Sequence, residues 1–212
     1  AAAFHGLIRT AHAVESGHRG ELASALAQWA SRWQPTPAVP GPALAFDDWS
    51  ARLASRRGEF NAVGRLIQAR MVAAAGSAAF RDLAGRLAPQ ADTLDRLNDL
   101  AVAEYARGGN FTVLHLCTAG RAARVLMPWV DDAAAAGREL IGAWTAALLS
   151  TPPIVEPAAV AAPAPLPWPE LRRRAIAQDD EHVIKLVHAC GELGAAAGSA
   201  PHLAAATRAI VA

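Results

Sequence analysis

Apolar and polar residues do not alternate over long stretches of this chain, so the main signature of β-strands is missing. Apolar residues gather instead in phrases such as HGLIRTAHAV, from His5, and ELASALAQWASRW, from Glu21. Alanine dominates and β-branched residues are sparse, a composition that favours helices. The pattern predicts an all-α fold, with one helix for each of these phrases and a break between them from Gly17 to Gly20.

Prolines predict where the helices stop, because proline lacks an amide hydrogen and clashes with the preceding turn. Eleven of the fourteen prolines lie in two segments, 35–44 and 151–169, which we predict to be proline-rich loops. The loops separate helical blocks at about 3–34, 45–149 and 170–211, and we interpret residues 1–212 as one helical domain. Further helix breaks are expected near Gly58, Gly76, Pro89 and Gly108–Gly109, and later helices are expected to begin near Asp179 or Asp180 and at Ser199.

Composition excludes several classes of function. A formal net charge of +1 argues against a nucleic-acid partner, and the uncharged stretch 140–155 is too short for a membrane span. Cys117 and Cys190 have neither CxxC spacing nor the density of a disulfide scaffold, so we interpret both as small core residues of a cytoplasmic protein. The first residues lack a basic region followed by a long apolar run, which argues against a signal peptide.

Lys185 is the only lysine among 20 basic residues, the rest being arginine. An arginine guanidinium keeps its proton near neutral pH, whereas a lysine amine can lose it and then act as a nucleophile or react with CO₂ to form a carbamate. Lys185 is therefore the first candidate for chemistry. The alternative is a surface ion pair with Asp179 or Glu181.

Histidines are the second candidate group, since four of the seven lie in apolar helical phrases. His5 and His12, seven residues apart, share one helix face about 10 Å apart along the axis, so other helices must complete any metal shell between them. His115 sits in the apolar phrase FTVLHLC, where a buried imidazole needs a polar partner. A lone buried histidine is usually a hydrogen-bonded core residue, but several on different helices favour a shared metal site.

The helix of DDEHVIKLVHAC adds the fourth histidine. His182 and Lys185, three residues apart, share a face and can present an imidazole and an amine to the same point, with His188 as an outer neighbour. Asp180 and Glu181 flank His182, and either can accept a hydrogen bond that orients a ligand imidazole. For Asp180, capping of the helix is an equal alternative.

Other catalytic templates fail or are weak. The chain has no GxSxG, HExxH, P-loop or GxGxxG sequence. Glu15-x-x-His18 matches half of a di-iron carboxylate motif and Asp179-x-x-His182 is a weak relative of it, but Gly17 breaks the first helix and two more acidic ligands are needed. A carbamate-lysine metallohydrolase is a weaker alternative, because such sites pair two metals with acidic ligands.

Taken in order, AFHGLIRTAHAV, ELASALAQWASRW, FTVLHLCTAGRAARVL, DDEHVIKLVHAC and HLAAATRAI resemble the questin oxidase family from about residue 4 to 211. The specific parts are the His-x6-His phrase and the DEHxIK phrase. The resemblance implies an oxygenase that opens anthraquinone-type rings, either as a Baeyer-Villiger-type monooxygenase or as a ring-cleaving dioxygenase. Because family members are usually longer before the first histidine phrase, the chain is interpreted as an N-terminally shortened member.

The resemblance also implies a ligand set. Fe(II) would be held by four imidazoles and a carboxylated lysine: His5, His12, His115, His182 and Lys185. The catalytic residues would be His182 and Lys185, with O₂ as co-substrate and a small aromatic molecule as substrate. NADPH is a candidate electron donor that no motif indicates. The remaining alternative is a non-catalytic helical protein that binds a small molecule and keeps a degenerate site.

Overall fold

In the computed structural model, the described residues are 2–36, 41–57, 66–154, 164–197 and 200–211. They form eleven α-helices, two short 3-10 helices and no strand, which confirms the predicted all-α fold. The helices are α1 (His5–Ser16), α2 (Arg19–Ser31), α3 (Phe46–Arg56), α4 (Ile67–Ala75), α5 (Ala78–Leu83), α6 (Thr93–Gly108), α7 (Phe111–Leu126), α8 (Ala133–Leu149), α9 (Trp168–Gln178), α10 (Glu181–Ala197) and α11 (Ala200–Val211).

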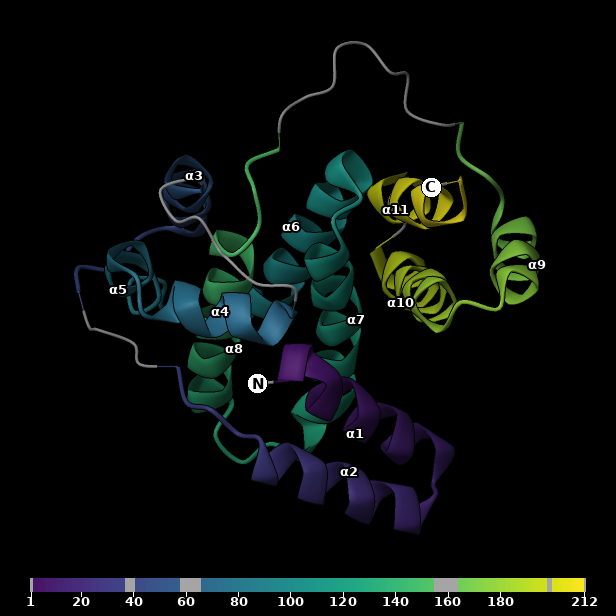
Figure 1. Cartoon of the computed structure of the whole chain (residues 1–212), viewed down its shortest axis with the longest axis horizontal. Coiled ribbons are helices and arrows are strands. Elements are labelled where there is room, and N and C mark those ends of the chain that lie inside the picture. Colours follow the sequence, from purple (N-terminus) through teal and green to yellow (C-terminus); the bar gives the residue numbers. More distant parts are fainter. Residues whose placement is uncertain (1, 37–40, 58–65, 155–163, 198–199, 212) are drawn as a thin grey trace.

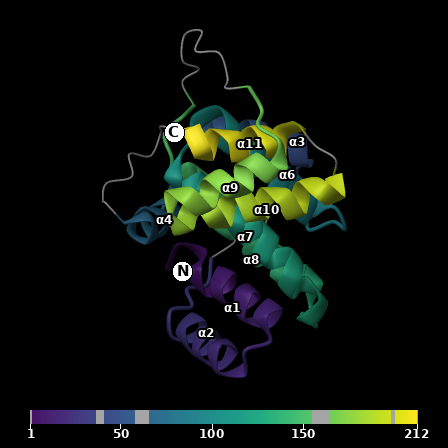
Figure 2. The same cartoon turned by 90° about the vertical axis from the view of Figure 1, so that its right-hand side faces the viewer.

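Helix α7 is the centre of the molecule. Thirteen of its sixteen residues are buried, so it is covered on nearly every side. Helices α1, α6, α8 and α10 all pack against it (Figure 1). Figure 2 shows α9, α10 and α11 lying together in front of α6 and α7, with α1 and α2 below them. A residue of α7 can therefore meet side chains from both ends of the sequence.

Local hydrogen bonds explain the helix ends near the centre. Gly109 ends α6 in the left-handed conformation, with φ of 62°, a region that suits a residue without a Cβ. Asn110 follows and its Oδ1 accepts from the amide of Thr112 at 2.8 Å, which caps the first turn of α7. The predicted breaks near Gly76, Pro89 and Gly108–Gly109 are confirmed, while Gly58 lies outside the described residues.

The proline segments are confirmed as non-helical where they are described, with one correction. Residues 35–36, 41–45, 151–154 and 164–167 carry no helix, and the rest of both segments up to Pro167 lies outside the described residues. Helix α9 begins at Trp168, so the loop ends two residues earlier than predicted. Pro169 belongs to the first helical turn, where backbone amides have no carbonyl partner within the helix, so proline loses no hydrogen bond there. Helix α11 is described from Ala200, and the predicted start at Ser199 lies outside the described residues.

The core is continuous from α1 to α11 and is rich in alanine and leucine. Cys117 and Cys190 are both fully buried, which confirms their prediction as small core residues. Burial raises the pKa of the Cys190 thiol to about 12, so this thiol stays protonated at neutral pH. No helix among the described residues has the length and apolar character to cross a membrane.

A close approach between α6 and α7 depends on Gly120. A Cβ at this position would lie 1.6 Å from Oδ1 of Asn98, far inside any allowed contact. The Asn98 amide is itself buried, and neither its oxygen nor its nitrogen has a hydrogen-bond partner among the described residues. Gly120 is therefore required by the Asn98 side chain and not by backbone conformation.

We expect Gly120→Ala to lower the free energy of unfolding by about 1–3 kcal/mol, because the new methyl group forces α6 and α7 apart. Asn98→Ala alone removes an unsatisfied amide and should cost less. The double variant should recover most of the loss, as shown by a double-mutant cycle in urea. Gly76→Ala is the control, since its Cβ would meet only two carbonyl oxygens, at 3.4 and 4.0 Å, which are ordinary contact distances. Equal effects of the two glycine changes would contradict the explanation.

Candidate functional site

His5 and His115 meet where α1 packs on α7. Their Nε2 atoms are 3.2 Å apart and their ring centroids are 5.2 Å apart, although 110 residues separate them in the chain. His115 is buried at 3% exposure in the second turn of α7, whereas His5 is exposed at the first position of α1. Packing of α1 on α7 brings the two imidazoles together.

The backbone before His5 is unusual. Ala3 and Phe4 both have positive φ, 49° and 69°, and neither is a glycine. Left-handed backbone at two consecutive side-chain-bearing residues is uncommon and costs free energy that the surrounding packing must supply. Phe4 is buried and its ring meets Trp144 edge-on at 5.4 Å between centroids, which anchors this turn and so the start of α1.

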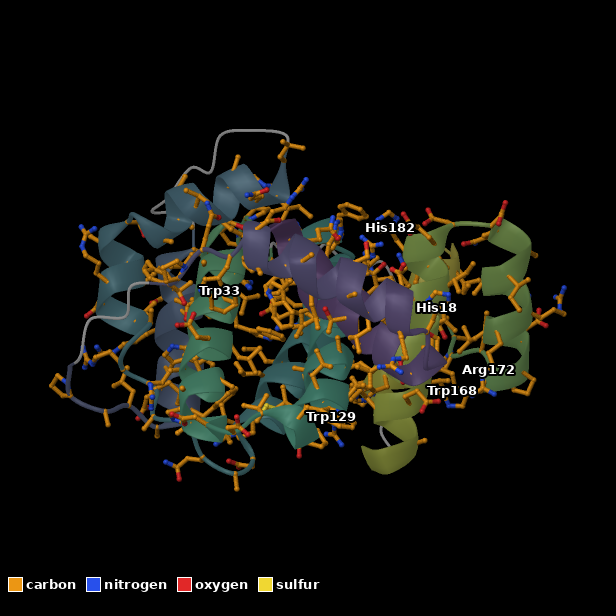
Figure 3. All side chains as sticks on the ribbon, turned by 90° about the horizontal axis from the view of Figure 1, so that it is seen from below. His18, Trp33, Trp129, Trp168, Arg172 and His182 are labelled. Carbon is orange, nitrogen blue, oxygen red and sulfur yellow. The ribbon has the colours of Figure 1, made fainter. Side chains whose placement is uncertain are left out.

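His182 is the third imidazole at this place. Its ring centroid lies 5.6 Å from that of His115, and Figure 3 shows it at the end of α10 that faces α1. Asp180 Oδ1 lies 3.2 Å from His182 Nδ1 and also accepts from the His182 amide at 2.8 Å. Asp180 therefore does both things that the sequence allowed, because it caps α10 and it orients the ring.

Phe111 is a site residue that the sequence analysis missed. Its carbonyl lies 2.9 Å from His115 Nδ1 and its ring stands edge-on to His115 and His182, at 4.8 and 4.9 Å between centroids. A helical spacing of four residues from His115 was the available signal. The carbonyl accepts the Nδ1 proton of His115, which leaves the lone pair on Nε2 of the neutral ring, the nitrogen that faces His5.

The imidazoles border a cavity of about 480 Å³ between α1, α2, α7 and α10. Its other polar lining comes largely from α1 and α2. Arg9 donates to Glu21 Oε1 at 2.5 Å and to Gln28 Oε1 at 3.0 Å, which ties these two helices together at the cavity wall. The predicted ligands that line this cavity are His5, His12, His115, His182 and Lys185.

The surroundings of His5, His12 and His115 lower the pKa of each imidazole, which favours the neutral ring. Burial, followed by the charges of Lys185 and His182, lowers the pKa of His5, and burial lowers the pKa of His115 to about 4. The pKa of His12 is lowered by burial and then by the nearby Arg121. Neutral imidazoles keep the lone pair that a metal ion requires.

His12 and Lys185 line the cavity but have polar partners of their own. His12 Nδ1 lies 3.6 Å from Glu15 Oε2, and Lys185 Nζ lies 2.5 Å from Glu181 Oε2. The ion pair with Glu181 that the sequence left open is therefore present, and the Lys185 side chain is 37% exposed. Hydrogen bonding to this ammonium lowers the pKa of Glu181.

The donor set fits a metal ion only in part. Two nitrogens bound at right angles to one ion at about 2.1 Å lie about 3 Å apart, and the His5 and His115 Nε2 atoms are separated by 3.2 Å. Among the described residues, however, no three His, Cys, Asp or Glu side chains close around one point. A third ligand from His182 or Lys185 therefore requires side-chain movement.

Three other candidates from the sequence have different surroundings. His18 is the N-cap of α2, where its Nδ1 accepts from the Glu21 amide at 2.9 Å, and Glu15 pairs with Arg121 through both carboxylate oxygens. The two residues of the di-iron half-motif thus lie on opposite sides of the break at Gly17. His188 is exposed on α10. The described residues that line the cavity do not include it.

Comparisons of the chain with protein-family models, with curated proteins and with solved structures found no match.

Proposed function

We propose that this protein is a non-haem iron oxygenase of the questin oxidase type, acting on a small aromatic substrate. The observation that carries the proposal is the 3.2 Å separation of the His5 and His115 Nε2 atoms at the wall of a cavity that His12, His182 and Lys185 also line. Imidazole nitrogens suit Fe(II), and open positions on such an ion supply the chemistry of O₂ activation.

The chain's own residues support this role in three ways. The Phe111 carbonyl and the Asp180 carboxylate hold the Nδ1 sides of His115 and His182, so the Nε2 lone pairs are available for binding. Burial, and after it the charges of Lys185 for His5 and of Arg121 for His12, lower the pKa of these two imidazoles, which favours their neutral forms. The cavity volume of about 480 Å³ lies within the range that small-molecule sites occupy.

Lys185 is proposed as the anionic ligand in its carboxylated form. Only the neutral amine reacts with CO₂, so the amine must first release Glu181 and turn into the cavity. Its position one helical turn from His182 allows this movement, because both side chains line the same cavity. The carbamate would then contribute one negative charge to a set of neutral imidazoles.

The second candidate function is a non-catalytic protein that binds a small molecule. It is favoured by the lack, among the described residues, of three ligand side chains that already close around one point. In this alternative the contact between His5 and His115 is a hydrogen bond, in which Nε2–H of His5 donates to Nε2 of His115. The cavity would then hold a polar molecule and no metal ion.

Anaerobic loading with Fe(II) separates the two functions. The oxygenase predicts one tightly bound iron per chain after gel filtration, and O₂ consumption that depends on a hydroxylated anthraquinone. The binding protein predicts that iron is lost on gel filtration and that O₂ consumption stays at the rate of free Fe(II). Loss of iron in the wild-type chain under these conditions would end the iron proposal.

Lys185→Arg tests the carbamate separately. The guanidinium keeps the ion pair with Glu181 but cannot be carboxylated, so folding should be unchanged while iron affinity falls by about 10-fold or more. Bicarbonate should raise iron affinity in the wild-type chain and have no effect in this variant. Iron affinity unchanged from that of the wild type would show that the amine serves only the ion pair.

A further inference from the structure

A second cavity lies along a different face of α1 from the imidazoles. Gly6 and Leu7 line it, whereas His5 and Ile8 line the imidazole cavity, and these pairs lie on different sides of one helix. The second cavity has a volume of about 320 Å³ and is bounded by α1, α2, α4, α7 and α8. Gln28 borders both cavities and forms part of the wall between them.

The lining of this cavity is adaptable and aromatic. The chain has only two methionines, Met71 and Met127, and both line it. Methionine is flexible and polarizable, a property that binding surfaces for varied apolar molecules use. Trp29 and Trp33 form an aromatic wall, with ring centroids 6.2 Å apart at an angle of 53°.

Trp29 reaches its position only because residue 6 is a glycine. A Cβ there would lie 2.7 Å from Cγ of the indole, a contact that real side chains do not make. Trp33 remains 49% exposed at the rim, as does Val130 at 37%. An exposed tryptophan at the mouth of an apolar cavity is a surface that an apolar occupant would cover.

The polar groups at this cavity balance in charge. Arg32 and Glu139 have opposite formal charges, and Glu139 Oε2 accepts from the Thr36 hydroxyl at 3.0 Å. The rest of the lining is almost entirely apolar. Such a cavity favours a molecule without net charge, because an ion would lose its hydration there without gaining a dedicated counter-ion.

From these observations we infer that the cavity between α1, α2 and α8 is a binding site for a small uncharged aromatic molecule, separate from the imidazoles. The occupant stacks against the two indoles, and the thioethers of the two methionines adjust to its shape. The site is independent of any metal, since none of the predicted metal ligands lines it.

The probe for this site is N-phenyl-1-naphthylamine, which is aromatic and uncharged at neutral pH. Titration into the full chain should give saturable probe fluorescence, with energy transfer from tryptophan. Ala143→Phe and Ala136→Phe, two changes that place a ring in the cavity, should each weaken binding about 10-fold or more. Ala134→Phe is the matched control, since this alanine is exposed on the same helix.

His115→Ala distinguishes this inference from the proposed function, because it should leave probe binding unchanged while it removes iron binding. Circular dichroism identifies any variant that fails to fold. If one of the two cavity-filling variants does not fold, the other one carries the test. Binding that does not saturate would overturn the inference, as would equal affinity of the cavity-filled and control variants. So would a second copy of the chain that covers the cavity, seen as a dimer that releases the probe on association.

Discussion

Replacing His115 by alanine is expected to weaken Fe(II) binding by more than about 100-fold, since even a hydrogen-bonding partner of a metal ligand contributes 10–100-fold. His115 is the buried member of the histidine pair, with one nitrogen held by the Phe111 carbonyl and the other facing His5. No other side chain in α7 can replace an imidazole at this point, because its neighbours in the cavity wall are Leu114 and Thr118. The measurement is a competition titration of anaerobic Fe(II) against a chelator of known affinity.

Two further variants make this result interpretable. His188→Ala removes an exposed imidazole from α10 that does not line the cavity, so it should leave iron affinity unchanged. His182→Ala removes a half-buried ring and tests the site without opening a hole in the core. Iron affinity that is the same in the His115→Ala and His188→Ala proteins would contradict the proposed site.

The largest effect on stability is expected for Glu104→Gln. Glu104 Oε2 and Arg57 Nη1 are 2.7 Å apart, and the two side chains are only 8% and 4% exposed. The change leaves the Arg57 guanidinium buried without its carboxylate, at an expected cost of about 3–5 kcal/mol in the free energy of unfolding. Urea denaturation followed by circular dichroism measures the loss.

The control for this change is Glu170→Gln, which breaks the ion pairs with Arg173 and Arg174 on the surface of α9. Solvent screens such pairs, so their loss should cost far less than the loss of the buried pair. The double variant Arg57→Met, Glu104→Leu should recover most of the stability, because no charge is then left buried. A loss for Glu104→Gln no larger than that for Glu170→Gln would show that Arg57 finds other solvation.

Single positions show why the helices were predictable and their partners were not. Gly109 and Asn110 end one helix and start the next through contacts with residues at most four positions away, and such contacts can be inferred from order in the chain. The start of α9 was misplaced because proline is excluded only from helix interiors, and Pro169 sits in a first turn. The break between α7 and α8 near Pro128 was not predicted at all.

At the candidate site too, contacts between residues close in the chain were predictable and contacts between helices were not. The pairs Lys185 with Glu181 and His182 with Asp180 join residues four and two positions apart, and both were among the alternatives that the sequence allowed. Phe111 was missed, although it is four residues from His115, because an apolar side chain carries no chemical signal of its own. Its role depends on where the ring of His182 arrives from α10.

The sequence by itself determined the all-α fold, most helix ends and the set of residues able to carry chemistry, since helix propensity, capping and proline exclusion act over a few residues. Only the tertiary structure decided which of them meet. His5 approaches His115 across 110 residues because α1 packs on α7, and the apolar cavity beside Trp29 exists because five helices leave a space between them. Neither depends on local sequence, because contacts between helices are set by how the whole core packs.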